Sequence, residues 1–182
     1  MPDRPAVFLD RDGTIVEDPG FLDRAGKVRL LAGAGEAIHQ LNQAGWLVIT
    51  VSNQSGIARG LYDATAYHAV QRRLVDLLAA HHARLDGAYF CPHHPEITGP
   101  CECRKPGVLL FREAQAALGL DFARCWWVGD RLSDVEPARQ LGGRGVLVAT
   151  GRGAAHAAQA RALGVPLVTD LAAAAAEIVR GG

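Results

Sequence analysis

Six short apolar runs alternate with segments of helical periodicity, and this alternation restricts the fold more than any other feature. The runs are rich in strand-forming residues and predict strands at 6–10, 46–52, 87–91, 125–129, 145–149 and 166–169. Helical patterns separate and follow them, near 34–44, 63–83, 107–119, 134–142, 153–163 and 170–180. Such alternation predicts a Rossmann-like, doubly wound α/β fold, with a mainly parallel sheet and helices on both faces.

Local signals predict where several helices begin and end. Gly45, Gly119 and Gly164 each stand where a helical pattern should stop, because glycine readily adopts the left-handed conformation that ends a helix. Asp63 is expected to cap the helix that follows it. The run Ser133-Asp134-Val135-Glu136 has the pattern of a capping box at the start of another helix.

Composition limits the class of protein. The chain has 182 residues, 49% of them hydrophobic, and we expect one domain over 1–182. Nineteen basic and nineteen acidic residues cancel. This balance gives no electrostatic argument for a nucleic-acid or membrane-surface partner, because binding to backbone phosphates needs a basic face. There is no apolar stretch near the roughly 20 residues of a membrane span, and residues 1–5 carry no signal-peptide pattern. We therefore expect a soluble, cytoplasmic monomer. Trp126 and Trp127 are expected to be core residues.

Two aspartates follow the first predicted strand. Asp10 and Asp12 come directly after Ala6-Val7-Phe8-Leu9, at the strand end where open α/β sheets bind ligands. Two neighbouring carboxylates repel each other unless a cation lies between them or one holds a proton. The pair therefore suggests a divalent metal site, or a nucleophile beside an acid/base. Taken alone, D-x-D-G also fits a polar turn in which Gly13 has a positive φ.

Further polar residues are expected at the same edge of the sheet. Ser52 and Asn53 end the second predicted strand, and Asp130 ends the fourth. Pro106 suits a first helical turn, which would place Lys105 at a helix amino end that favours an anion. Each position has a simple structural explanation, but together they indicate a site for phosphate and magnesium. There is neither a P-loop motif nor a G-x-S-x-G motif, so the nucleophile must be a carboxylate or water.

Four motifs in this order resemble those of the haloacid dehalogenase superfamily of phosphotransferases. They are D-R-D-G-T, S-N, R-K-P and G-D-x-x-x-D, and the resemblance covers about residues 5–150. It implies that Asp10 is the nucleophile, which forms an aspartyl phosphate, and that Asp12 is the general acid/base. Mg²⁺ would be held by Asp10, the main-chain carbonyl of Asp12 and Asp130. Ser52 and Lys105 would hold the transferring phosphoryl group.

Two interpretations of Asp134, in the last motif, remain open. It is either a further carboxylate of the site or an acid that only stabilises the first turn of a helix.

A cysteine- and histidine-rich insert, residues 91–103, precedes the third motif. Cys91, His93, Cys101 and Cys103 form a C-x-H and a C-x-C pair, four ligands suited to tetrahedral Zn²⁺ with no open position. The alternative is three unrelated thiols beside surface histidines. His94 has no assigned role. We expect the fourth cysteine, Cys125, to be a buried apolar residue in a strand.

The insert together with R-K-P is similar to one subfamily, the D-glycero-D-manno-heptose-1,7-bisphosphate 7-phosphatases and the related histidinol phosphatases. About 40 residues separate the first two motifs, which leaves no room for a large cap domain. The resemblance implies removal of the 7-phosphate of the heptose bisphosphate, in the synthesis of ADP-heptose for lipopolysaccharide. Candidate contacts to the sugar or its second phosphate are Asp18, Pro19, Gly20, Phe21, Asn53, Gln54, Ser55, Arg104 and Arg131.

Three alternatives to heptose bisphosphate hydrolysis remain open. Hydrolysis of histidinol phosphate is the nearest one, although no dehydratase domain of histidine biosynthesis follows in the chain. A polynucleotide 3′-phosphatase would share the catalytic motifs, but the balanced charge provides no basic groove. A zinc-organised binding module without catalysis would require the acidic edge to be idle.

Overall fold

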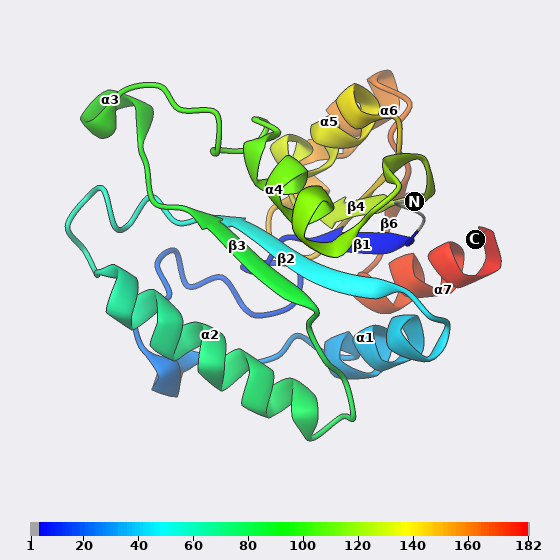
Figure 1. Ribbon diagram of the computed structural model, residues 1–182, viewed down its shortest axis with the longest axis horizontal. Coiled ribbons are helices and arrows are strands. Elements are labelled where there is room, and N and C mark those ends of the chain that lie inside the picture. Colours follow the sequence, from blue (N-terminus) through cyan, green and yellow to red (C-terminus); the bar gives the residue numbers. More distant parts are fainter. Residues whose placement is uncertain (1–3, 182) are drawn as a thin grey trace.

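The fold is built on one sheet of six parallel strands, ordered β3-β2-β1-β4-β5-β6 (Figure 1). The computed structural model describes residues 4–181. The strands are β1 (Ala6–Leu9), β2 (Leu47–Asn53), β3 (Gly87–Cys91), β4 (Trp126–Gly129), β5 (Arg144–Val148) and β6 (Leu167–Val168). Each lies where an apolar run predicted a strand, with ends shifted by no more than a residue or two.

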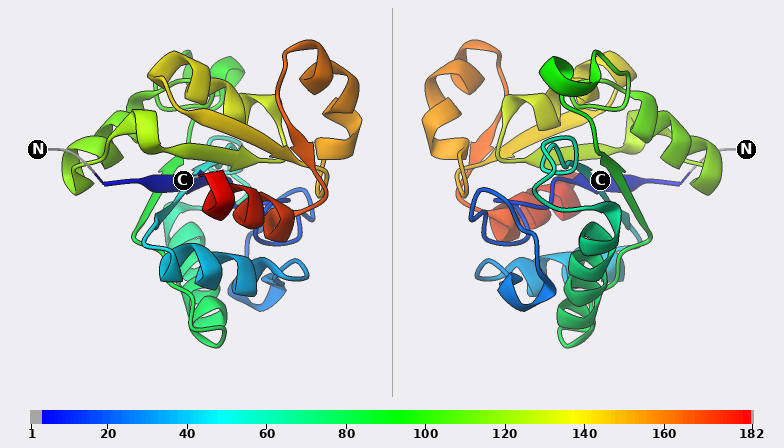
Figure 2. Two further views of the ribbon diagram at one scale, coloured as in Figure 1. Left: turned by 90° about the vertical axis from the view of Figure 1, so that its right-hand side faces the viewer. Right: turned by 90° about the vertical axis from the view of Figure 1, so that its left-hand side faces the viewer.

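Helices cover both faces of the sheet, as predicted. Figures 1 and 2 show α1, α2 and α7 on one face and α4, α5 and α6 on the other. The helices are α1 (Ala34–Gln43), α2 (Ala64–Ala79), α3 (Pro95–Thr98), α4 (Leu109–Leu118), α5 (Leu132–Leu141), α6 (Ala157–Ala162) and α7 (Leu171–Gly181). Short 3₁₀ turns are η1 (Ala25–Lys27), η2 (Phe122–Arg124) and η3 (Gly153–His156). Of the helices within residues 4–181, none combines the length and the apolar character needed to cross a bilayer.

Alternating strand residues supply two cores on opposite faces. Val7 of β1 packs with the buried side chains of α1, α2 and α7, whereas Phe8 faces α4. Trp126 packs in the same core as Val7 and Trp127 in the same core as Phe8, which confirms that both tryptophans are core residues. The Phe8 ring lies 4.9 Å from that of Trp127. Side chains burying both faces hold the sheet rigid between the two helix layers.

Most of the predicted helix ends are confirmed. The carboxylate of Asp63 accepts a hydrogen bond from the N–H of Ala66, 2.8 Å away, and caps α2. Gly45, Gly119 and Gly164 have φ angles of 86°, 67° and 68°, which are left-handed conformations that cost little for glycine.

The predicted start of α5 was wrong. The helix begins at Leu132 with Arg131 as its N-cap, two residues before the expected cap at Ser133. The Asp134 carboxylate accepts the N–H of Arg131 at 2.9 Å. The reciprocal pair is therefore Arg131 with Asp134, not Ser133 with Glu136.

The predicted position of Lys105 at a helix amino end was also wrong. Helix α4 begins at Leu109, and the Lys105–Pro106 peptide bond before it is cis. The Asn53 side chain binds both sides of the Lys105 backbone, accepting from its N–H at 2.9 Å and donating to its carbonyl at 3.1 Å. These contacts from the end of β2, rather than a helical turn, position Lys105.

The strand order places a crevice at the carboxyl ends of β1 and β4. The connections from these two strands run in opposite directions, and in open α/β sheets ligands bind at such switch points. Asp10 follows β1 and Asp130 follows β4. The segment between Asp12 and α1 forms a loop with the turn η1 rather than a cap domain, as expected.

Candidate active site

A pocket of about 510 Å³ opens at the carboxyl edge of the sheet. Its wall includes most of the residues expected at the site, namely Asp10, Asp12, Asp18, Gly20, Phe21, Asn53, Gln54, Ser55, Arg104, Lys105 and Arg131. Pro19, Ser52 and Asp130 are not among the described residues that line it. Asp134, for which the sequence left a role in the site open, also lines it, and the lining residues that were not predicted are Leu22, Arg59, Tyr62, His94, Ser133 and Arg152.

Three carboxylates, from the chain after β1, the chain after β4 and the first turn of α5, converge at this pocket. Asp10, Asp130 and Asp134 each bring one oxygen to within 4.8 Å of the others. Asp130 is fully buried, and its Oδ1 has no hydrogen-bond partner among the described residues. Its Oδ2 accepts the N–H of Arg152 at 2.8 Å. A buried carboxylate oxygen without a partner is costly, so this oxygen set fits a hard divalent cation such as Mg²⁺.

Lys105 is the cation of the cluster. Its Nζ lies 2.8 Å from an oxygen of Asp10, 2.8 Å from one of Asp134 and 2.5 Å from the carbonyl of Val51. Burial opposes the charge on Lys105, but Asp10 and Asp134 outweigh it and raise the pKa of its ammonium group. The three carboxylates of the cluster outnumber its one ammonium group, which leaves a surplus of negative charge.

The surplus affects Asp10 most clearly. Burial raises the pKa of the Asp10 carboxyl; Lys105 works against this effect, while Asp134, Asp12 and Asp130 add to it. A bound divalent cation would offset both the burial and the repulsion and keep the carboxylates ionised. The positions of the carboxylate oxygens and their surplus of negative charge therefore both indicate a single metal site.

Two glycines make room for Asp130. Gly13 and Gly151 have φ angles of 87° and 56°, and a Cβ on them would lie 2.5 Å and 2.2 Å from Asp130 Oδ2. The hydroxyl of Thr150 donates to the carbonyl of Gly13 at 2.7 Å and ties the two loops together. The glycine of D-x-D-G thus serves the site as well as the turn.

Asp12 lies on the wall of the pocket, apart from the cluster of three carboxylates. Arg11 donates to both of its oxygens, through Nε to Oδ1 at 3.1 Å and through a terminal nitrogen to Oδ2 at 2.9 Å. Gln54 donates a further hydrogen bond to Oδ2 at 2.9 Å. The side chain of Asp12 remains 21% exposed, so it can reach a molecule in the pocket.

Ser52 lies below the pocket surface. It is 2% exposed, and its hydroxyl accepts a hydrogen bond from Gln54 at 3.1 Å. A direct contact between this hydroxyl and a phosphoryl group stays a prediction. His94, which had no assigned role, lies 2.8 Å from Arg59, measured from Nε2 to a guanidinium nitrogen. This pair connects the insert, residues 91–103, to the loop after β2.

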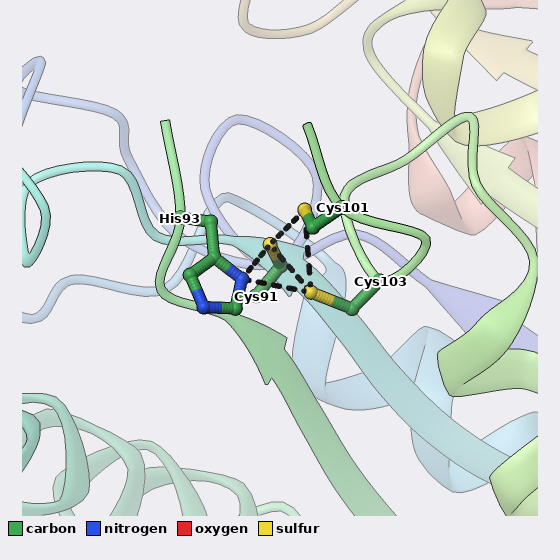
Figure 3. A group of neighbouring side chains, drawn as sticks. All are labelled: Cys91, His93, Cys101 and Cys103. Atoms are coloured by element: carbon green, nitrogen blue, oxygen red, sulfur yellow. Dashed lines mark hydrogen bonds between the residues drawn. The ribbon is translucent and has the colours of Figure 1, made fainter. Parts of the chain in front are cut away.

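The four predicted zinc ligands form a second cluster (Figure 3). Cys103 Sγ lies 3.0 Å from Cys91 Sγ, 3.5 Å from Cys101 Sγ and 3.2 Å from His93 Nδ1. Cys91 Sγ lies 3.7 Å from both Cys101 Sγ and His93 Nδ1. Thiolates bound tetrahedrally to zinc at about 2.3 Å lie about 3.8 Å apart. The cluster is slightly tighter than this and has the arrangement of a closed tetrahedral site.

The electrostatics of this cluster also suit a cation. Burial raises the pKa of the Cys91 and Cys103 thiols, so their ionisation needs a compensating charge. Burial acts in the same direction on Cys101, but the backbone N–H of Arg104 and the neighbouring side chains lower its pKa to about 7. Cys125 is buried in the core, as predicted, but it lies between η2 and β4 rather than in a strand. Burial raises its pKa to about 11.

Comparison with known proteins shows to which family the chain is related. Residues 102–174 match the family model described as HAD-hydrolase-like. A D-glycero-beta-D-manno-heptose-1,7-bisphosphate 7-phosphatase of Yersinia pestis is 38% identical over 154 residues, which cover 81% of this chain and 82% of that protein. The protein of the same name from Pseudomonas aeruginosa is 35% identical and covers 97% of this chain and 99% of its own.

A solved structure agrees with these relatives. The D,D-heptose 1,7-bisphosphate phosphatase of B. bronchiseptica, complexed with magnesium and phosphate, superposes with a TM-score of 0.89 at 34% identity. The match covers 98% of this chain and 99% of that one. The strand-end motifs, the carboxylate cluster and these relatives lead to one conclusion: the chain belongs to the haloacid-dehalogenase-like hydrolases, in the family of the D-glycero-D-manno-heptose-1,7-bisphosphate 7-phosphatases.

Proposed function

We propose that this protein is a Mg²⁺-dependent phosphatase that removes the 7-phosphate of D-glycero-D-manno-heptose 1,7-bisphosphate. The main support is the cluster of Asp10, Asp130 and Asp134 at the switch point of the sheet, with Lys105 bound to two of the three carboxylates. The names of the relatives supply the substrate. By the same resemblance, the reaction would contribute to the synthesis of ADP-heptose for lipopolysaccharide.

The chemistry of the pocket suits a bisphosphate. Its volume of about 510 Å³ is within the usual range for small-molecule sites. Arg59, Arg104, Arg131 and Arg152 line it, and a guanidinium can bind a phosphate with two hydrogen bonds. We propose that the arginines hold the phosphate that is not transferred, while Asp18, Asn53 and Ser55 contact the sugar.

In the first proposed step, a carboxylate oxygen of Asp10 attacks phosphorus. The bond from phosphorus to the sugar oxygen breaks, its electron pair stays on that oxygen, and Asp12 donates the proton that the oxygen takes up. Lys105 lies 2.8 Å from Asp10, close enough to stabilise negative charge on the phosphoryl oxygens. Mg²⁺ held by Asp10, Asp130 and the carbonyl of Asp12 would, when bound, neutralise charge on the same oxygens.

In the second step, Asp12 takes a proton from a water molecule as that water attacks the phosphorus of the aspartyl phosphate. The bond from phosphorus to Asp10 breaks, which releases inorganic phosphate and restores both carboxyl groups. The partial exposure of the Asp12 side chain lets it face first the sugar oxygen and then water.

We also propose that Cys91, His93, Cys101 and Cys103 bind structural Zn²⁺. The charge and geometry of the cluster support this assignment, and His93 and Cys103 are connected to the pocket through their neighbours His94 and Arg104. We further propose that residues 1–182 act as one domain. The monomeric state and the cytoplasmic location stay predictions.

The test is phosphate release from a panel of substrates: the α and β anomers of the heptose bisphosphate, fructose 1,6-bisphosphate and histidinol phosphate. We expect the heptose bisphosphates to be hydrolysed with the highest kcat/KM. Asp10→Asn should abolish turnover and spare the zinc content, while the exposed Asp76→Asn on α2 serves as the matched control. Retained turnover in Asp10→Asn would exclude the aspartyl phosphate, and a clear preference for histidinol phosphate would replace the proposed substrate.

A further inference from the structure

Gln54 was predicted to contact substrate, but its amide is already fully occupied within the protein. Its Nε2 donates to Asp12 Oδ2 at 2.9 Å and to Ser52 Oγ at 3.1 Å. Its Oε1 accepts from Arg11 at 3.1 Å and from the Tyr62 hydroxyl at 2.6 Å. An amide offers two donor hydrogens and two acceptor lone pairs, so these bonds use its whole capacity.

Arg11 is the second side chain that holds Asp12. It is 1% exposed, and its guanidinium lies 5.3 Å from the centre of the Tyr67 ring. Its Nε and one terminal nitrogen bind the two oxygens of Asp12 in the side-by-side geometry that fixes a carboxylate plane. A buried guanidinium stacked on a ring has little freedom to move, and neither does the carboxylate that it holds.

The hydrogen bonds leave the two oxygens of Asp12 unequal. Oδ2 accepts from both Arg11 and Gln54, whereas Oδ1 accepts only from Arg11 among the bonds of the described residues. A carboxylate oxygen has two lone pairs, so Oδ1 retains one for a proton. Oδ1 is therefore the oxygen of Asp12 that remains available for proton transfer.

Tyr62 connects this arrangement to the wall of the pocket. Its ring lines the cavity, and its hydroxyl donates the 2.6 Å hydrogen bond to Gln54. Gly56 lets the ring approach the backbone, since a Cβ there would lie 2.2 Å from Tyr62 Cε1 and 3.0 Å from Phe21 Cδ1. Tyr62 is thus fixed at both ends, by the wall and by the Gln54 amide.

We propose that Arg11, Gln54 and Tyr62 are positioning residues that aim Oδ1 of Asp12 at the leaving oxygen of the substrate. The proposal rests on the proposed function, because it assigns these residues to the proton transfer of that reaction. It replaces the expected contact between Gln54 and the sugar: Gln54 acts through Asp12 instead.

The dependence on the leaving group separates this role from a structural one. A sugar alkoxide is a poor leaving group and needs a proton as it departs, whereas p-nitrophenolate and acetate are stable anions that leave without one. The second step, in which Asp12 activates water, is common to every substrate, so the substrates are compared by kcat/KM, which depends only on steps up to release of the leaving group. A misaimed Asp12 should lower kcat/KM for the heptose bisphosphate and leave that for p-nitrophenyl phosphate or acetyl phosphate much less affected. A general loss of fold would slow all of them equally.

The experiment measures kcat and KM of Gln54→Leu and Tyr62→Phe on both kinds of substrate. For Gln54→Leu we expect kcat on the heptose bisphosphate to fall about 100-fold, the usual cost of misplacing a reacting group by about 1 Å. KM should change little, and the ratio of kcat/KM for the heptose bisphosphate to kcat/KM for p-nitrophenyl phosphate should fall. Tyr62→Phe keeps the ring and should shift the ratio in the same direction by a smaller factor.

Gln71→Leu is the matched control. Gln71 is a buried glutamine on α2 whose amide donates to the Thr50 hydroxyl at 3.4 Å, outside the pocket lining, so its ratio should equal that of the wild type. Equal losses of kcat/KM on both substrates, or no loss, in Gln54→Leu would overturn the proposal. If Gln54→Leu does not fold, the same comparison of the two substrates is made with Tyr62→Phe, and an unchanged ratio in that variant would overturn the proposal. Inactivity of the wild type on every phosphate ester would instead refute the proposed function itself.

Discussion

Gly13→Ala tests whether the position of Asp130 controls the proposed magnesium site. An alanine Cβ at this position would lie 2.5 Å from Asp130 Oδ2 and 2.9 Å from its Cγ. An ordinary contact begins near 3.4 Å, so the carboxylate must move by about 0.9 Å. The Cα of Gly151 lies 3.2 Å from the same Cβ, so the backbone crowds this position as well.

The displacement is large on the scale of catalysis. Functional groups must be held within about 0.5 Å of their working positions, and an error of about 1 Å can cost about 100-fold in rate. We therefore expect kcat/KM to fall about 100-fold and the Mg²⁺ concentration for half-maximal activity to rise. The positive φ of 87° adds about 1–2 kcal/mol of backbone strain for any residue with a Cβ.

The assay is phosphate release against Mg²⁺ concentration, together with thermal unfolding. Gly45→Ala is a matched control, because Gly45 has a φ of 86° and none of the described atoms beyond its chain neighbours lies within 4 Å of its Cβ position. Strain alone should lower the Tm of either variant by about 2–8 °C. Only Gly13→Ala should need a higher Mg²⁺ concentration for half-maximal activity.

A Gly13→Ala variant that responded to Mg²⁺ and turned over like Gly45→Ala would refute this reasoning. It would mean that Asp130 either tolerates the shift or contributes nothing to the metal site. Loss of activity in both variants to the same degree would point to instability as the cause.

Two further predictions concern zinc and stability. Chelation of zinc should make Cys91, Cys101 and Cys103 reactive toward a thiol reagent. Cys125 is buried and its pKa is raised to about 11, so its thiol should react only on unfolding. Four reactive thiols in the folded, chelated protein would contradict this prediction. Asp63→Ala removes the cap of α2 and should lower the free energy of unfolding by about 1 kcal/mol without changing kcat/KM. A changed kcat/KM would show that α2 contributes to the site.

Local patterns in the sequence predicted most of the fold. The period of apolar residues is a property of the strand or helix itself, so β1 and β2 were found within a residue of their ends. Asp63 and Gly119 were also predicted correctly, since a cap needs only its neighbouring residues. The four predicted zinc ligands came together as expected, because C-x-H and C-x-C spacing brings each pair close along the chain.

The errors lie where distant contacts decide the conformation. Pro106 fits several local structures, and the Asn53 side chain, far away in sequence, fixes the turn at Lys105. Gln54 follows β2 and lines the pocket as expected, but the sequence could not show that its amide binds Asp12 and Tyr62 there.

The sequence by itself determined the order of strands and helices, the residue types at the strand ends and the ligands suited to zinc, all of which depend on near neighbours in the chain. Only the tertiary structure decided that Asp134 joins Asp10 and Asp130, with Lys105 between two of them. The physical reason is that the direction and charge state of a side chain depend on burial and on partners from other strands, and folding alone brings these together.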